Sequence, residues 1–440
     1  MSYLMRNYAH IENGAKELVE AVNFGNADDV IKVLKKYEKN CHDICTTITE
    51  DGNTALHYMA QRFRPPILQI LLDVGVEINA RNNDGDTPLQ TALHYNNLMA
   101  AKLLIENGAD VNHVISKKSG FSILHKVVLG DLLQATQLLI EKGALVDIRD
   151  NDGRTPLHVS LLRNNIKMAV LLLERGAEVN SCDNTGKNAL HLSIIYQQPE
   201  LTRLLIQRGA DVISKDLSGM TPLHLSSKNG YYDITKMILK KSTMNVNTKE
   251  KTMGRTPLHL ACEIGHLKIA KTLIDNGSDV NVSTSFRKSP LHIAAANGSS
   301  DIVLLLLRHY ANVNMLTIGN KTPLHNATEG GHVNIAMSLI QNGANVNLRD
   351  LQGFTLLHYS AKSGNLNCLN VLLRSGANIN NYDNKRRTAL HTAILNKNMD
   401  VAMTLVKAGI NFNAEDESHQ TAMDYDETGK LKQLIEKVYR

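Results

Sequence analysis

The chain has 440 residues, of which 43% are hydrophobic, and its formal net charge is +5 at pH 7. So small a charge on a chain of this length gives no argument for binding to nucleic acid or to an anionic membrane surface. No apolar run approaches the roughly 20 residues that a membrane-spanning helix needs, and residues 1–30 are too polar for a secretory signal peptide.

The N-terminal part of the chain predicts an end unit rather than a domain of its own. Residues 1–13 are expected to form a short, loosely ordered tail. Residues 14–50 predict a capping helix pair over 17–34, interrupted at Gly25, and then a long polar connector. The many charged residues on this pair suit a unit that has one face in water.

The connector contains Cys41, His42 and Cys45, which are the residue types of a zinc site. Because no second pair of ligands lies nearby in the sequence, we favour a polar connector over a metal site. The five cysteines of the chain are odd in number and mostly scattered, which disfavours a disulfide scaffold. This usage suits a reducing compartment, so we expect a cytoplasmic or nuclear protein.

A four-residue opening then recurs along the chain, most often as Thr-Pro-Leu-His. The fourth positions of the opening are residues 57, 90, 125, 158, 191, 224, 259, 292, 325, 358, 391 and 424. Nine of the eleven intervals are 33 residues long and two are 35. A fixed period of this length predicts a solenoid of stacked units. The two longer intervals place insertions at 113–120 and 240–254, on the side of the repeat where binding surfaces are common.

One repeat, residues 254–281, illustrates the expected local structure. Thr256 can cap a short helix, Pro257 suits its first position, and Gly265 ends it. An apolar stripe over 267–274 predicts a second helix, and an extended finger follows. Two short helices and a finger cannot enclose a core, so each unit must bury its apolar faces against its neighbours.

The motif and its period resemble the ankyrin repeat over about residues 14–440. The resemblance implies an all-α ankyrin-repeat solenoid, in which helix-turn-helix units with β-turn fingers stack into one curved array. Repeats would cover 51–420, and 421–440 would form a C-terminal capping repeat with a final helix over 430–438.

Ten of the twelve fourth positions are histidine: His57, His125, His158, His191, His224, His259, His292, His325, His358 and His391. The resemblance implies a structural role, in which each imidazole hydrogen-bonds the backbone between adjacent repeats. Histidines one repeat apart would be separated by about 8–10 Å, too far to share one metal ion.

The resemblance also implies that partners dock in the concave groove, into which the residue before each opening should point. The candidate partner-binding residues are Phe121, Arg154, Lys187, Met220, Arg255, Lys288, Lys321, Phe354 and Arg387, with Tyr196 and Ile264 at the ends of first helices. Six of the eight preceding residues from 154 to 387 are Lys or Arg. This basic stripe either binds an acidic or phosphorylated partner or belongs to the common framework of ankyrin repeats.

No Gly-rich phosphate loop, GxSxG or HExxH motif is present, so we expect neither enzymatic activity nor a cofactor. The sequence predicts a scaffold, adaptor or inhibitor whose partner is a protein with an acidic or extended segment. It predicts no binding of nucleic acid and no insertion into a membrane. Two alternatives stay open: a host-directed effector of a virus or intracellular bacterium, and a cytosolic assembly module of a larger membrane or signalling complex.

Overall fold

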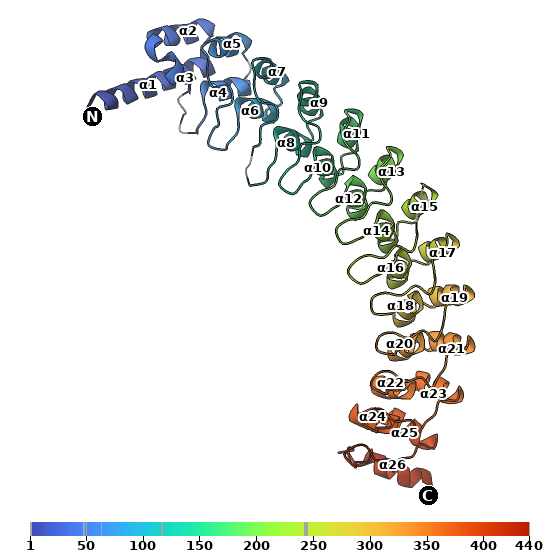
Figure 1. Ribbon diagram of the computed structural model, residues 1–440. Helices are drawn as coiled ribbons and strands as arrows, with labels where there is room; N and C mark the ends of the chain where they lie inside the picture. The colour runs from blue at the N-terminus through green and yellow to red at the C-terminus, as the bar shows by residue number, and fades with distance from the viewer. Residues whose placement is uncertain are drawn as a thin grey trace. The chain divides into compact units, whose positions relative to one another are not determined.

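The computed structural model describes residues 2–46, 49, 51–62, 64–115, 118–241 and 245–439 (Figure 1). These residues form two compact units, 1–211 and 212–440. Each unit is built from paired helices joined by extended fingers, and the described residues contain isolated β-bridges but no longer strand. The all-α repeat fold predicted from the sequence is therefore confirmed. Parts of the two predicted insertions, 116–117 and 242–244, lie outside the described residues.

The first unit contains α1 (Ser2–Phe24), α2 (Ala27–Lys36), the 3₁₀ helix η1 (Glu38–Asn40), α3 (Cys41–Thr46), α4 (Ala55–Arg62), α5 (Pro65–Asp73), α6 (Pro88–His94), α7 (Leu98–Glu106), α8 (Ile123–Leu129), α9 (Leu133–Glu141), α10 (Pro156–Leu162), α11 (Ile166–Glu174), α12 (Ala189–Ile195) and α13 (Pro199–Gln207).

The second unit contains α14 (Pro222–Asn229), α15 (Tyr232–Lys241), α16 (Pro257–Ile264), α17 (Leu267–Asp275), α18 (Pro290–Ala296), α19 (Ser300–Arg308), α20 (Pro323–Glu329), α21 (Val333–Gln341), α22 (Leu356–Ser363), α23 (Leu366–Arg374), α24 (Ala389–Leu395), α25 (Met399–Lys407) and α26 (Lys430–Tyr439).

The N-terminus differs from the expected loose tail. Helix α1 begins at Ser2 and runs without interruption to Phe24, so residues 2–13 continue the first helix of the cap. The connector is also partly helical, because η1 and α3 occupy 38–46. Helix α3 lies close against α1 at Gly14, where an added Cβ would come within 2.8 Å of the Ile44 side chain. Packing against α1 thus explains why the polar connector is structured.

Helix α3 also places the three residue types that suggested zinc. Cys45 is buried, Cys41 is half-buried and His42 is exposed, so the helix directs them to different surroundings. Burial raises the pKa of the Cys45 thiol to about 12, which keeps it protonated at neutral pH. Among the described residues, no three His, Cys, Asp or Glu side chains are grouped as a metal site requires.

The repeat that contains α16 and α17 shows how the opening forms a helix start. The Thr256 side chain accepts a hydrogen bond from the His259 backbone N–H, and the His259 Nδ1 accepts the Thr256 backbone N–H at 3.1 Å. This is a capping box in which histidine takes the place usually held by Glu or Gln. Gly265 ends α16 in the left-handed conformation, with φ of 94°. The short helix is thus defined at both ends by its own sequence.

Successive repeats bury each other's apolar faces. Helix α16 packs against α14 and α18, and α17 packs against α15 and α19. The contacts bury Leu258, Ala261, Ile269 and Leu273 almost completely. In each unit the fingers extend from the side of the even-numbered helices between α4 and α24, which makes those helices the inner layer (Figure 1).

The last repeat opens without an inner helix. Asp424 stands where other repeats have histidine, and its Oδ2 accepts the Thr421 backbone N–H at 2.7 Å. A series of turns follows, and the chain then forms α26, whose Leu431 is buried against the preceding repeat. The predicted final helix over 430–438 therefore matches α26 to within one residue.

One outer-helix ending carries an unfavourable residue. The position two residues after α17 and α21 is glycine with positive φ, Gly277 at 88° and Gly343 at 89°. After α19 the same position is Tyr310, which has φ of 61° and is 90% exposed. A bulky residue in this region costs conformational energy, and the exposed ring gains little packing in return.

We expect Tyr310→Gly to raise the free energy of unfolding by about 1 kcal/mol, because glycine adopts this conformation without a Cβ penalty. Urea denaturation of the full chain, followed by circular dichroism, measures the change. Tyr310→Ala is the control, since it removes the ring but keeps the Cβ and should stay close to the wild type. A loss of stability in both variants would show that the ring itself stabilises the fold.

Candidate functional site

Most repeat histidines join their helix start to the next finger, although Nε2 of the buried His158 and His325 forms no such bond. His259 Nε2 lies 3.1 Å from the Lys288 carbonyl oxygen, and His292 Nε2 lies 3.0 Å from that of Lys321. Since Nδ1 accepts a backbone N–H, Nε2 carries the proton and donates to the carbonyl. The same bond is made by His57, His125, His224, His358 and His391 to the residue before the next opening. For His125, His224, His259, His292 and His358, the carbonyl bound is therefore that of a predicted groove residue.

Burial keeps these imidazoles neutral. It lowers the pKa of His224, His259 and His292 from 6.5 to about 4, against the opposing effect of their backbone hydrogen bonds. All ten repeat histidines are buried. A neutral, buried imidazole that uses both nitrogens in hydrogen bonds is a structural element, and it is not available to a substrate as an acid or base.

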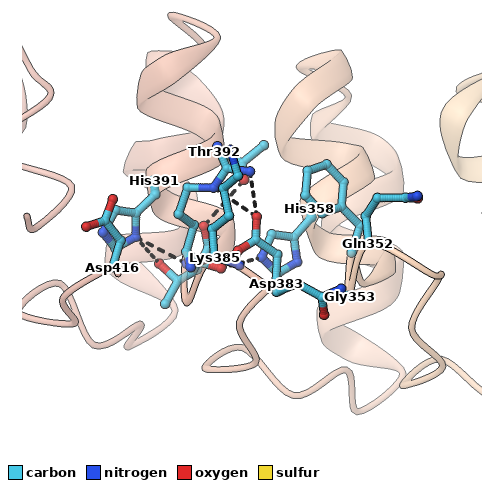
Figure 2. A network of polar contacts seen from close by, with 12 residues as sticks. Gln352, Gly353, His358, Asp383, Lys385, His391, Thr392 and Asp416 are labelled. Carbon is cyan, nitrogen blue, oxygen red and sulfur yellow. Dashed lines mark hydrogen bonds and ion pairs between the residues drawn. The ribbon is translucent and has the colours of Figure 1, made fainter. Parts of the chain in front are cut away.

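A second network lies beside each histidine, at the base of the finger. Figure 2 shows it around Asp383, which lies between His358 and His391. Asp383 Oδ1 accepts the backbone N–H groups of Lys385 at 2.8 Å and of Arg387 at 2.9 Å. Its Oδ2 accepts from Arg387 Nε at 2.9 Å and from the terminal nitrogen at 2.7 Å. The carboxylate closes the finger turn and is neutralised by the groove arginine.

The same arrangement recurs at two other groove arginines. Arg154 Nε donates to the buried Asp150 at 2.8 Å, and Arg255 Nε donates to the buried Glu250 at 3.4 Å. Burial raises the pKa of Glu250, but hydrogen bonds from the Thr252 side chain and from backbone N–H groups outweigh it and hold the pKa at about 2. Glutamate replaces aspartate here because this finger has one extra residue to span. These arginines support buried acids, so most of their charge is internally compensated.

Two lysines of the second unit lack such a partner. In the finger that carries Lys288, the base residue is Thr284, and in the finger that carries Lys321 it is Thr317. The hydroxyl of each threonine accepts the backbone N–H of the lysine at 3.1 Å. A hydroxyl closes the turn without adding a negative charge. Lys321 pairs with the exposed Glu329 at 2.8 Å, whereas the Lys288 ammonium forms no ion pair with any described residue. An unpaired positive charge is thus left at Lys288, whereas Lys321 is paired only with an exposed glutamate.

The predicted groove residues differ in their accessibility. Lys288, Tyr196 and Ile264 are exposed, and the other eight, Phe121, Arg154, Lys187, Met220, Arg255, Lys321, Phe354 and Arg387, are half-buried. Phe121 stacks on His125 with ring centroids 5.3 Å apart, and Phe354 stacks on His358 at 5.4 Å. Both aromatic rings therefore pack against the framework.

A hollow of about 270 Å³ lies beside Lys288 in the second unit. Its walls come from the fingers and from the inner helices α16 and α18, and include Met253, Arg255, Phe286, Lys288 and Ile293. Met253 and Phe286 are about half exposed, at 45% and 54%. Neither was among the predicted site residues, because the prediction considered only the residue before each opening and the end of the first helix. An apolar residue in a turn was the signal that could have identified them.

A similar hollow in the first unit is lined by Leu93, Ile123, Lys126, Leu129 and Arg163, among others. Here the lysine is compensated, since Lys126 Nζ lies 2.8 Å from the Asp86 carboxylate. In the part of the chain that the structure describes, no helix is both long and apolar enough to cross a membrane.

Comparison with known proteins identifies repeats over most of the chain. A family model for ankyrin repeats, in sets of three copies, matches residues 18–115, 112–183, 171–250, 214–284, 242–317, 291–383 and 344–416. The B-cell lymphoma 3 protein homolog of Mus musculus is 36% identical over 110 residues, which are 24% of this chain and 24% of that protein.

Two further relatives come from different settings. A putative ankyrin repeat protein of fowlpox virus is 33% identical over 116 residues, 26% of this chain and 34% of the viral protein. Protein phosphatase 1 regulatory subunit 12A of Mus musculus is 29% identical over 109 residues, 24% of this chain and 10% of that protein. The matched region thus spans between 10% and 34% of the length of these relatives.

Acid should destabilise the fold through the buried histidines. As the pH falls from 6.5 towards about 4, the unfolded chain takes up protons that the folded His259 and His292 do not, so the free energy of unfolding decreases. Urea midpoints at about pH 7.5 and about pH 4.5 measure the loss.

A double variant isolates the histidine contribution. Glutamine is tolerated at this position, since Gln90 Oε1 accepts the Thr87 backbone N–H at 2.5 Å. His259→Gln with His292→Gln should lose less stability on acidification than the wild type. His94→Gln with His309→Gln, both exposed, is the matched control and should behave like the wild type. Equal acid losses in all three proteins would contradict this account.

Removal of a groove arginine should leave a buried acid uncompensated. We expect Arg387→Ala to lower the free energy of unfolding by about 2 kcal/mol, because the Asp383 side chain is 1% exposed. Adding Asp383→Asn should recover part of the loss, and Lys385→Ala on the same finger should change stability by less than about 0.5 kcal/mol. Urea denaturation compares the four proteins. If Arg387→Ala left the free energy of unfolding unchanged, the ion pair between Arg387 and Asp383 would not stabilise the finger.

Proposed function

The chain belongs to the ankyrin-repeat family, and we propose that it is a non-enzymatic scaffold, adaptor or inhibitor that binds a protein partner on the finger side of its inner helices. Ankyrin repeats are generally protein-interaction modules, and their concave surfaces suit extended partners. The observation that carries the proposal is the unpaired positive charge of Lys288 beside an open hollow, with Lys321 on the next finger held only by the exposed Glu329.

The charge distribution favours an acidic partner. Lys288 is exposed and unpaired within the described residues, and the threonines beneath the two lysines contribute no negative charge. A carboxylate or phosphate of a partner can therefore bind Lys288 without displacing an ion pair, and at Lys321 it competes only with the exposed Glu329. At Arg154, Arg255 and Arg387 the same binding would compete with a buried acid. This distinction narrows the proposed binding surface to the fingers of 284–321.

The relatives agree with a binding role. The phosphatase relative is a regulatory subunit by name, and we extend the same kind of role, acting by binding rather than by catalysis, to this chain. We place its action in the cytoplasm or the nucleus, in keeping with unpaired cysteines.

A second candidate is a host-directed effector that binds a host protein. The 33% identity to the fowlpox virus protein supports it. The two candidates use the same surface and differ in the origin of the partner.

Charge reversal at Lys288 and Lys321, which neutralise no buried acid, tests the proposal. Lys288→Glu with Lys321→Glu should weaken partner binding by about tenfold or more, because two attractive charges become repulsive. The partner is first captured from lysate with the wild-type chain, identified, and then titrated as a purified protein.

The matched control makes the same charge change on an outer helix. Lys268 and Lys271 are exposed on α17, so Lys268→Glu with Lys271→Glu should leave the affinity unchanged. Thermal denaturation must show that all three proteins are folded. If both double variants bind as well as the wild type, the groove is not the binding surface.

A further inference from the structure

The fingers of four consecutive repeats in the second unit expose an apolar side chain at their tips. These residues, which we call the apolar tip row, are Met253, Phe286, Ile318 and Leu351, with exposed fractions of 45%, 54%, 56% and 58%. The finger before them also exposes an apolar residue, Leu217 at 65%, whereas other tips are polar: Asn151 and Asp152, Asn184 and Thr185, and Asn384 and Lys385. Asn, Asp and Gly suit tight turns for backbone reasons, and exposed apolar residues do not.

The tip row is continuous, because backbone hydrogen bonds join neighbouring fingers. The Ser285 N–H donates to the Met253 carbonyl at 2.8 Å, and the Ile318 N–H donates to the Phe286 carbonyl at 3.2 Å. The Leu351 N–H donates to the Gly319 carbonyl at 3.0 Å. The four apolar residues therefore lie along one edge of the unit, and they are not isolated surface residues of the kind that need no explanation.

The apolar residues of the tip row bring no evident gain in stability to the fold. At polar tips an asparagine side chain bonds the preceding finger, as Asn184 Nδ2 does with the Asn151 carbonyl at 2.8 Å and Asn384 Nδ2 with the Leu351 carbonyl at 2.9 Å. Ile318 and Leu351 occupy the position of these asparagines and have no donor to offer. Two repeats thus forgo a stabilising bond and expose apolar surface instead, which points to a use outside the fold.

The tip row adjoins the uncompensated positive charge. Met253 and Phe286 line the hollow together with Arg255 and Lys288. Arg287, next to Phe286, is also exposed. Glu263 also lines the hollow and pairs with Arg255, so the free positive charge beside this apolar recess comes from Lys288 and Arg287. Such a surface suits a bulky apolar side chain that is flanked by carboxylates.

Nucleic acid fits the same surface less well. Phe286 is the only aromatic member of the tip row, and Met253, Ile318 and Leu351 offer no flat face for stacking bases. Glu263 and Glu329, whose side chains are 44% and 51% exposed, stand beside Arg255 and Lys321 and would repel a phosphate backbone. A peptide can place its few acidic groups between these glutamates, whereas a regular phosphate chain cannot.

We propose that the tip row and the adjoining hollow bind an acidic segment of a protein partner, which inserts one bulky apolar side chain between Met253 and Phe286 and continues across Ile318. Carboxylates on either side of this anchor bind Lys288 and Arg287. The proposal rests on the proposed function and specifies the chemistry of the partner that this surface recognises.

A displayed library of random twelve-residue peptides, selected on the full-length chain, tests the proposal. Enriched peptides should contain Asp or Glu around one Phe, Leu, Met or Trp. The best peptide is then synthesised with a fluorescent label and titrated by anisotropy against wild type and variants. A labelled oligothymidine of similar length is titrated in parallel.

The decisive variant is Phe286→Ser with Ile318→Asn, which makes the tips resemble the polar tips of the other repeats. It should weaken peptide binding by about tenfold or more while the melting temperature stays close to that of the wild type. Leu304→Asn with Met337→Asn is the matched control, because it removes two exposed apolar residues from outer helices of the same unit. Its affinity should stay within about twofold of the wild type.

The other outcomes overturn the inference. Peptides without acidic residues, an unaffected tip variant, tighter binding of the oligothymidine, or no enrichment at all would each do so. Suppose that a peptide fails to bind the Lys288→Glu, Lys321→Glu variant and yet binds the tip variant as tightly as the wild type. This result would contradict the role of the tip row but would agree with the proposed function. The proposed function itself fails only if partner binding survives charge reversal in the groove.

Discussion

The hydrogen bond by which repeat histidines such as His259 and His292 hold the next finger is the interaction on which the rest of the structure depends. Helices of seven to ten residues are marginal by themselves, and no repeat encloses a core. His292 caps its own helix through Nδ1 and holds the Lys321 carbonyl through Nε2. One buried, neutral side chain therefore sets the helix start, the spacing to the next repeat and the position of a groove residue. The framework and the candidate binding surface share the same bond.

The base of the finger decides whether a groove cation belongs to the framework or is free for a partner. Where the base is Asp383 or Glu250, the groove arginine neutralises a buried carboxylate. Where the base is Thr284, the turn closes through a hydroxyl and Lys288 keeps its charge. Residues that look equivalent along a basic stripe thus have different roles. The difference is set four or five residues upstream, at a side chain that no partner touches.

The repeat period, the helix pairs and the caps could be predicted from the sequence because each is encoded locally, as in the cap at Thr256 and the end at Gly265. The start of α1 at Ser2 was not predicted, because the contacts of α1 with α3 and α4 are tertiary and are not visible in the sequence. The candidate site was found only in part. Lys288 was predicted. Met253 and Phe286 were missed because only the folded structure shows that they line a hollow together with residues of α16 and α18. The ion pair of Arg387 could have been inferred from the sequence, because Asp383 lies four positions earlier.

Departures from the repeat pattern are concentrated in one stretch of the second unit. Between 250 and 351 one finger gains a residue, two lose their buried acid, and four tips become apolar. Tyr310, which occupies a glycine position, lies in the same stretch. In a solenoid each repeat contacts only its neighbours, so the cost of such departures stays local and the remaining repeats are unaffected. Non-glycine residues with positive φ also occur outside this stretch, for example Arg386 and His419, so it is the run of exposed apolar tips that favours selection for a surface over relaxed folding requirements.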